Sequence, residues 1–210
     1  MPDILKMGLV LTVVGLVCTG FLALVEQKTR EPIAAAKQAE IEKSLKAVLP
    51  QGYDNQPVVD AAEFADKRLN AKASPVKFYR ARKGSETLGA AFVVTAPDGY
   101  AGDIAIMMAV APGGTVLGAE IVAHKETPGL GDKYNHPWID AFQGKTLKSV
   151  KWGVKKDGGD FSNKTGATVT PRAIVKAVKR GLEFYAENEA NILAPAPAAS
   201  PPAAPAKAGG

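Results

Sequence analysis

The sequence has one cysteine, Cys18, and two histidines, His124 and His136, in 210 residues. One thiol excludes a disulfide framework and a thiolate metal site, and two imidazoles alone do not make a zinc centre. A basic stripe interleaved with aromatic residues is also missing, so the formal net charge of +5 does not indicate nucleic-acid binding. Redox chemistry in this chain would therefore require a borrowed cofactor.

What the sequence does contain is an uncharged run of 19 residues at 7–25. A helix needs about 20 residues to cross the hydrocarbon core of a bilayer. No small-x-small cleavage site follows the run, which favours a retained anchor over a secretory signal peptide. Small residues fall on one helical face and predict close packing against other membrane helices, with chance as the alternative because glycine and threonine are common in such helices. These residues are Gly8, Thr12, Gly15, Thr19 and Ala23.

After the anchor, residues 29–49 predict a helix with Pro32 in its first turn. Apolar and β-rich segments then predict five strands, at 77–81, 87–94, 103–110, 116–122 and 149–154. A short helix is expected at 135–142, with Trp138 in the core and a cofactor platform as the alternative role of this residue. The predicted fold class is α+β, a small antiparallel sheet with flanking helices, tethered by one N-terminal transmembrane helix.

The predicted organisation has five parts. It comprises an N-terminal tail at 1–6, a transmembrane helix at 7–25, a connecting helix at 26–50, a globular domain at 51–193 and a disordered Ala/Pro-rich tail at 194–210. Lysine and arginine are commoner just after the transmembrane helix than before it, which weakly favours a cytoplasmic C-terminal side.

A hydroxyl-rich turn, Thr-Gly-Ala-Thr-Val-Thr-Pro at 165–171, runs into a helix with one apolar stripe. Thr170 suits the N-cap position and Pro171 the next one, where its missing amide proton costs nothing. The free amides and the positive dipole end of a helix N-terminus favour a phosphate group. The alternative is an ordinary loop with a good cap.

Three segments resemble a flavoprotein family. Residues 165–170 are similar to the Ser/Thr-Gly-Ala-Thr-x-Thr/Ser motif of proteins that bind FMN covalently. These are the G subunit of Rnf electron-transport complexes and the C subunit of Na+-translocating NADH:quinone reductase. Residues 99–104 resemble the Gly-Tyr-x-Gly-x-Ile turn of the family, and residues 124–131 its His-x-Glu-Thr-Pro-Gly-Leu-Gly loop. The continuation at 171–178 and the chain length are more similar to the Rnf G subunit.

The resemblance implies that residues 51–193 form an FMN-binding domain, with the FMN phosphate esterified to Thr168. The other candidate cofactor-binding residues are Thr165, Gly166, Ala167, Thr170, Glu126, Thr127, Leu130, Gly131 and Tyr100. By analogy, Leu130 packs on the flavin ring and Thr127 bonds its edge. For Glu126, pairing with Lys125 or Lys133 is the alternative. Electron transfer itself needs no catalytic base or nucleophile.

The implied function is electron transfer within a ferredoxin:NAD+ oxidoreductase complex coupled to Na+ or H+ translocation, as a component of the complex rather than an enzyme alone. The implied partners are the other Rnf subunits, the lipid bilayer, and a flavin transferase that moves FMN from FAD with a divalent metal. The family also implies a bacterial inner-membrane location with the main domain in the periplasm, against the charge count. The alternatives are the C subunit of the quinone reductase and an anchored binding domain that is never flavinylated.

The sequence departs from the family pattern at one position. Six residues before the modified threonine the family commonly has aspartate, whereas this chain has Ser162, with Asp160 two residues further back. If the transferase needs that carboxylate, we expect modification to be slower or to use Asp160.

Overall fold

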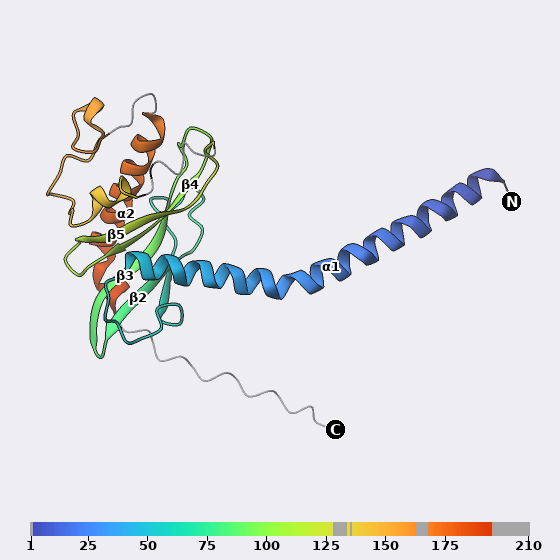
Figure 1. Cartoon of the computed structure of the whole chain (residues 1–210), viewed down its shortest axis with the longest axis horizontal. Helices are drawn as coiled ribbons and strands as arrows, with labels where there is room; N and C mark the ends of the chain where they lie inside the picture. The colour runs from blue at the N-terminus through green and yellow to red at the C-terminus, as the bar shows by residue number, and fades with distance from the viewer. Residues whose placement is uncertain (1, 128–133, 135, 163–167, 195–210) are drawn as a thin grey trace, which may run out of the picture. The chain divides into compact units, whose positions relative to one another are not determined.

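The computed structural model describes residues 2–127, 134, 136–162 and 168–194. Its elements follow the order α1 (Asp3–Val48), β1 (Ala61–Phe64), β2 (Val76–Lys83), β3 (Glu86–Ala96), β4 (Ile104–Val110), β5 (Val116–His124), the 3-10 helices η2 (Ile139–Phe142) and η3 (Lys155–Asp157), and α2 (Val169–Leu193). The chain divides into two compact units, Met1–Lys43 and Ser44–Gly210. A five-stranded antiparallel sheet with two α-helices confirms the predicted α+β class (Figure 1).

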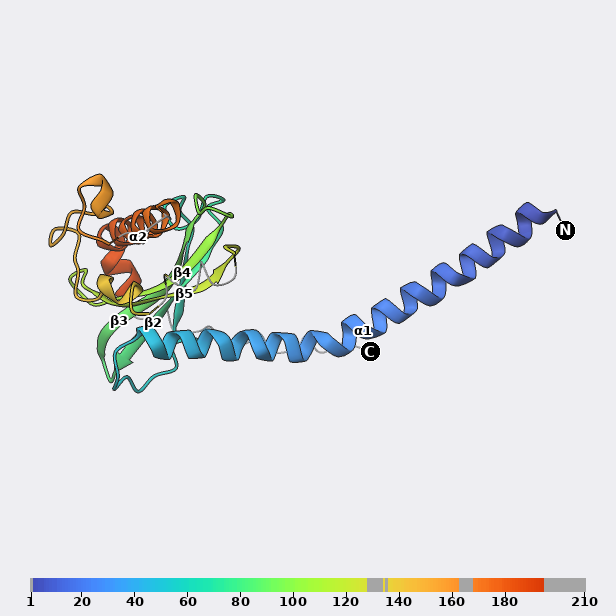
Figure 2. The same ribbon diagram turned by 45° about the horizontal axis from the view of Figure 1, so that its top comes forward.

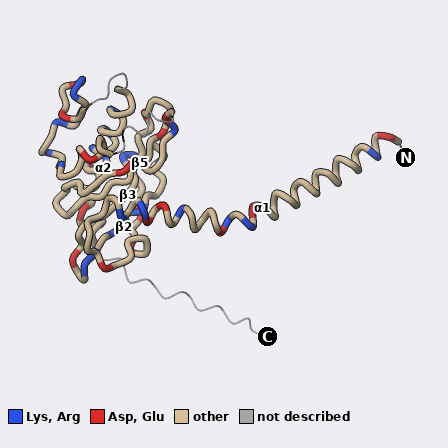
Figure 3. Tube along the Cα trace, in the orientation of Figure 1, with Lys and Arg blue, Asp and Glu red and all other residues tan. Residues whose placement is uncertain are grey.

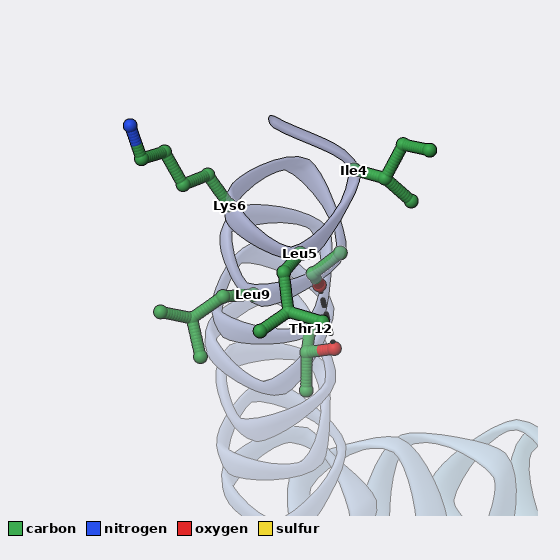
Figure 4. A pocket seen from close by; sticks show the side chains of 6 residues that line it. Ile4, Leu5, Lys6, Leu9 and Thr12 are labelled. Carbon is green, nitrogen blue, oxygen red and sulfur yellow. Dashed lines mark hydrogen bonds between the residues drawn. The ribbon is translucent and has the colours of Figure 1, made fainter. Parts of the chain in front are cut away.

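The first unit is the greater part of α1, which is long and apolar enough to cross a membrane. Figure 3 shows a long stretch without charged residues between the charges near its N-terminus and those around its middle. One shallow hollow along its surface is lined by Ile4, Leu9 and Thr12 among others. In Figure 4 the side chains of Ile4 and Leu9 point away from the helix axis, and the Thr12 hydroxyl donates to the carbonyl of Gly8 at 2.9 Å. Apolar groups directed outward are typical of a helix whose solvent is lipid.

Pro32 does not begin a second helix, as the sequence predicted, but lies inside α1. Proline lacks an amide proton and so removes one helical bond, and its ring crowds the carbonyl four residues earlier. The Thr29 hydroxyl donates to the carbonyl of Val25 at 2.8 Å, one turn earlier. The helix then ends at Val48, one residue before the predicted end at Leu49.

The sheet is an antiparallel meander in which the strands lie in chain order, β1 to β5. Short turns join β2 to β3 and β4 to β5, and Gly84, Gly113 and Gly114 adopt positive φ angles of 59°, 86° and 82° there. Such angles cost glycine little, whereas a Cβ would strain them. Strand β4 is almost entirely buried, as suits its apolar sequence, and it pairs with β3 on one side and β5 on the other.

Helix α2 covers one face of the sheet (Figures 1 and 2). Gly181 permits this close packing, because a Cβ there would lie 2.7 Å from Val94 Cγ1 and 2.9 Å from Met108 Sδ. The last turn of α1, residues 44–48, lies on the opposite face (Figure 2), where a Cβ on Gly118 would lie 3.1 Å from the Val48 backbone. Both faces of the central strands are therefore covered.

An aromatic cluster extends the core beyond β5. Trp138 and Phe142 make an edge-to-face pair with ring centroids 5.6 Å apart, and Phe142 stacks on Phe161 at 4.5 Å. Trp138 is 6% exposed, as expected for a core residue. The strand predicted at 149–154 is wrong, because only Val154 makes a bridge, to Phe161. The sequence also missed β1. Within the range 135–142, where a helix was predicted, the structure has the 3-10 helix η2.

Candidate functional site

The three segments that resemble the flavoprotein family meet at one side chain, Glu126. Its carboxylate is buried, with 7% of the residue exposed. One oxygen, Oε1, accepts a hydrogen bond from the backbone amide of Tyr100 at 2.8 Å and another from the Thr170 hydroxyl at 3.1 Å. The turn at 99–104, the loop that begins at His124 and the start of α2 are therefore joined at a single atom.

The turn before β4 approaches this carboxylate closely because it contains glycine. A Cβ on Gly99 would lie 2.2 Å from the carbonyl oxygen of Gly102 and 3.0 Å from Glu126 Oε1. Gly102 itself has a φ angle of 126°, which L side chains rarely adopt. The turn that the sequence singled out therefore needs both glycines to bring the Tyr100 amide to Glu126.

At the start of α2 the structure corrects one sequence prediction. Thr168, not Thr170, is at the N-cap position, and its side chain makes no capping hydrogen bond. Its carbonyl accepts the first helical bond, from the Arg172 amide at 3.2 Å. Thr170 lies within the first turn, 5% exposed, and its hydroxyl bonds Glu126 instead of a helix amide. Thr170 does not cap the helix because it is the second residue inside α2, which begins at Val169.

The structure brings five of the candidate residues into one neighbourhood. The Tyr100 amide and the Thr170 hydroxyl both bond to Oε1 of Glu126. Thr127 directly follows Glu126 in the chain, and Thr168 lies two residues before Thr170. The Tyr100 side chain is 74% exposed and Val169, beside Thr168, is 44% exposed, so apolar surface borders the site. The candidates Leu130, Gly131, Thr165, Gly166 and Ala167 lie outside the described residues.

Two aromatic residues, Tyr134 and Trp138, pack together near Glu126. Tyr134 is buried against Trp138, with ring centroids 5.3 Å apart. Burial raises the pKa of the Tyr134 phenol, and the nearby Glu126 carboxylate raises the same pKa further. Trp138 donates its indole Nε1–H to the carbonyl of Ser162 at 2.7 Å. The sequence favoured a core position for Trp138 over a cofactor platform, and no local spacing connected it with Ser162.

Charged residues flank the start of α2. Arg172 binds Asp157 in a two-pronged ion pair, with both nitrogen–oxygen distances at 2.7 Å. The Arg172 guanidinium holds the pKa of the Asp157 carboxyl below its usual range. Asp160, the candidate substitute for the missing acid at Ser162, accepts a bond from the Lys151 amide at 2.7 Å. Among the described residues, no three His, Cys, Asp or Glu side chains are grouped to hold a metal ion.

Comparison with known proteins gives two family matches. Residues 1–48 match the RnfG N-terminal region, and residues 99–183 match the FMN-binding domain, which spans Tyr100, Glu126 and Thr168. The first match lies on α1 and the second contains the whole candidate site.

Several curated proteins are similar along most of this chain. The G subunit of the ion-translocating oxidoreductase complex of Pseudomonas aeruginosa (strain UCBPP-PA14) is 42% identical over 205 residues, which are 94% of this chain and 95% of that protein. The G subunit from Shewanella baltica is 39% identical, covering 90% and 92% of the two chains. That of Cereibacter sphaeroides (strain ATCC 17029) is 41% identical, covering 90% and 88%. Taken with the two family matches, these similarities show that the chain belongs to the family of G subunits of ion-translocating oxidoreductase complexes.

Proposed function

We propose that the chain carries FMN as a phosphoester on the Thr168 hydroxyl and, anchored by α1, transfers electrons within an ion-translocating oxidoreductase complex. The observation that carries this proposal is the position of Thr168 at the N-cap of α2 with a hydroxyl that makes no capping bond. The match to the FMN-binding domain supports the cofactor, and the relatives named as G subunits support the complex.

The start of α2 fits the phosphate of such a group. The amides of Val169 and Thr170 precede the first helical bond and have no acceptor within the helix, and Pro171 has no amide proton to satisfy. Two donors without a helical acceptor, at the positive end of a helix dipole, stabilise an anion. This contribution is about 0.3–1 kcal/mol for a partly exposed site.

Attachment at Thr168 is a phosphoryl transfer without redox change. Thr168 Oγ1 forms a bond to the flavin-side phosphorus of FAD, and the bond from that phosphorus to the bridging oxygen breaks. AMP leaves with the bridging oxygen, and the hydroxyl proton passes to a base. The flavin transferase supplies the FAD and the divalent metal, so this chain supplies only an accessible hydroxyl in a defined position. If Asp160 replaces the missing acid, its Oδ1 can serve while Oδ2 accepts the Lys151 amide.

Once bound, the cofactor supplies the electron transfer, and the protein supplies position and surroundings. Tyr100 and Val169 are exposed next to the attachment point and give the planar ring apolar surface. A ring on the surface of the domain remains within reach of a redox partner. This arrangement suits a protein that exchanges electrons with neighbouring subunits rather than with a diffusing substrate in a closed pocket.

We further propose that α1 spans the bacterial inner membrane, packs against other subunits there, and holds the main domain in the periplasm. The length and hydropathy of α1 support the span, and the family resemblance supports the orientation. A reporter enzyme fused to the C-terminus reads the orientation directly. Activity of a reporter that works only in the cytoplasm would overturn it.

The attachment is tested by intact mass and in-gel flavin fluorescence after co-expression with the transferase. We expect the mass of one FMN phosphoester on the wild-type chain and complete loss of covalent flavin in Thr168→Ala. Thr87→Ala is a matched control, since Thr87 is also half-buried but lies in β3. An unmodified wild-type chain, or unchanged fluorescence in Thr168→Ala, would support the unmodified binding domain instead.

A further inference from the structure

The two threonines at the start of α2 have opposite surroundings. Thr170 is 5% exposed and its hydroxyl is engaged by Glu126, whereas Thr168 is half-buried and its hydroxyl makes no capping bond. Successive helical residues turn by about 100°, so residues two apart point in directions about 200° apart. The φ and ψ angles of Thr168, −108° and −23°, lie in the helical region, so the rotation of about 200° also applies between Thr168 and Thr170. A Thr170 side chain held toward Glu126 therefore directs Thr168 away from it.

Glu126 is well suited to fix that direction. Its Oε1 receives two donors from segments that are 26 and 44 residues away in the sequence. A buried carboxylate is costly to leave without donors, and hydrogen bonds to a charged acceptor are stronger than neutral ones. Rotation of the first turn of α2 would break the bond to Thr170 and leave the carboxylate with the Tyr100 amide as its remaining described donor. The junction thus holds the turn in one rotational setting.

We propose that Glu126 is a positioning residue which, through Thr170, fixes the first turn of α2 so that Thr168 presents its hydroxyl for flavin attachment. The same contact explains why the hydroxyl of Thr170, two residues further on, is not the acceptor. This inference rests on the proposed attachment of FMN at Thr168. It assigns Glu126 to the protein scaffold of the site, with its bonding oxygen directed at Tyr100 and Thr170.

The test measures the initial rate of flavin incorporation into the full-length chain in detergent, with purified transferase, FAD and Mg²⁺. Peptide mapping reports which threonine carries the flavin. We expect Glu126→Ala and Thr170→Val each to lower the rate at Thr168 about tenfold, because each removes the same charge-assisted bond. The double variant is expected to be no slower than Glu126→Ala alone, since partners in one contact are not additive.

Conservative variants separate positioning from a general loss of fold. Glu126→Gln keeps an oxygen that accepts both bonds, and Thr170→Ser keeps the hydroxyl, so both are expected to stay within about threefold of wild type. Glu120→Ala is the matched control, because it removes a half-buried carboxylate from β5 away from the junction. We expect no change in rate for this control.

A second measurement needs no flavin. Hydrogen exchange of the unmodified chain should show faster exchange of the first amides of α2 in Glu126→Ala and Thr170→Val, and wild-type exchange in Glu126→Gln. Wild-type incorporation rates in both Glu126→Ala and Thr170→Val, or unchanged exchange in both, would overturn the positioning role. Absence of flavin from the wild-type chain would instead contradict the proposed attachment, so the two failures are distinguishable.

Discussion

The two ends of α2 are treated differently by the rest of the domain. At the C-terminal end, Arg80 and Arg82 donate to the last carbonyls of the helix, and Asp60 binds both guanidinium groups. At the N-terminal end, Thr168 makes no capping bond and Glu126 engages the turn only through Thr170. Side chains bond the C-terminal end of α2, whereas the threonine at its N-cap makes no capping hydrogen bond.

This contrast follows the demands of function and helix electrostatics. The negative end of a helix dipole favours cations, which Arg80 and Arg82 provide within the domain. The positive end favours an anion, and the natural anion for an FMN-carrying protein is the phosphate of its cofactor. A full cap by the Thr168 hydroxyl would satisfy the helix but occupy the atom to which we propose that the FMN phosphate is attached. Under the proposed attachment, the domain anchors the C-terminal end of α2 and leaves the N-cap threonine for the cofactor.

The largest effect is expected at the C-terminal end, on removal of Arg80. The Arg80 side chain is 2% exposed and lies 2.9 Å from the Asp60 carboxylate, which is 19% exposed and also binds Arg82. Breaking a buried pair from one side costs about 3–5 kcal/mol when the remaining charge has no partner, so we expect Arg80→Met to cost about 3 kcal/mol, because Arg82 still binds Asp60. Urea unfolding of the full chain in detergent measures this cost. Below the unfolding midpoint, flavin attachment at Thr168 should be unchanged.

Arg82→Met serves as the comparison for Arg80, because Arg82 shares Asp60 but its side chain is 14% exposed. Its free energy of unfolding should fall by less. If Arg80→Met costs under about 1 kcal/mol, a figure typical of surface ion pairs, the C-terminal end of α2 is not anchored as described.

A smaller effect is expected at the middle of α2, where Gly181 lies against the sheet. In Gly181→Ala the new Cβ would meet Val94 Cγ1 at 2.7 Å and Phe92 Cε2 at 3.3 Å. Overpacking of this kind costs about 1–3 kcal/mol, which exceeds the gain of about 1 kcal/mol in helix propensity. Gly181→Val should cost more than Gly181→Ala in thermal unfolding. A stabilised Gly181→Ala would show that propensity wins and that α2 can move off the sheet.

The sequence predicted α2 and most of the strands because the patterns that indicate them are local. The apolar stripe of α2 and the alternating or apolar strands follow from periodicity, and strands β2 to β5 lie close to their predicted positions. Strand β1 was missed because Ala61–Phe64 is short and contains no β-branched residue. The predicted strand at 149–154 failed because Trp152 packs beside Phe161 in the aromatic cluster instead of pairing with a neighbouring strand.

The roles of the site residues were harder to predict because they depend on distant partners. Thr168 and Thr170 both have the chemistry of an N-cap, and only the bond between Thr170 and Glu126, 44 residues apart, separates their roles. The pairing of Arg80 with Asp60 is equally invisible to local patterns, since either charge is usually solvated. The family resemblance supplied Thr168 itself. The predicted contacts of Leu130 and Gly131 remain predictions, as these residues lie outside the described part of the chain.

The smallest effect is expected from Asp157, which is paired with Arg172 at the N-terminal end. Because Arg172 lowers the pKa of Asp157, the folded state holds this proton less tightly than the unfolded state does. The stabilisation by the pair is therefore fully present above the ordinary value of 3.8 and is lost as the pH falls through the lower folded-state pKa. The difference in melting temperature between wild type and Asp157→Asn should stay constant between neutral pH and about pH 5, then shrink below.

The pair is exposed to solvent, so added salt should reduce the same difference at neutral pH. The Asp66 carboxyl, whose pKa Arg68 also lowers, titrates in both chains and cancels from the comparison. A difference that grows toward low pH would mean that Asp157 is protonated more readily in the folded chain, and Arg172 would then not be its controlling partner. Constancy in salt would place the pair in a more buried setting and make the N-terminal end of α2 as firmly held as the C-terminal one.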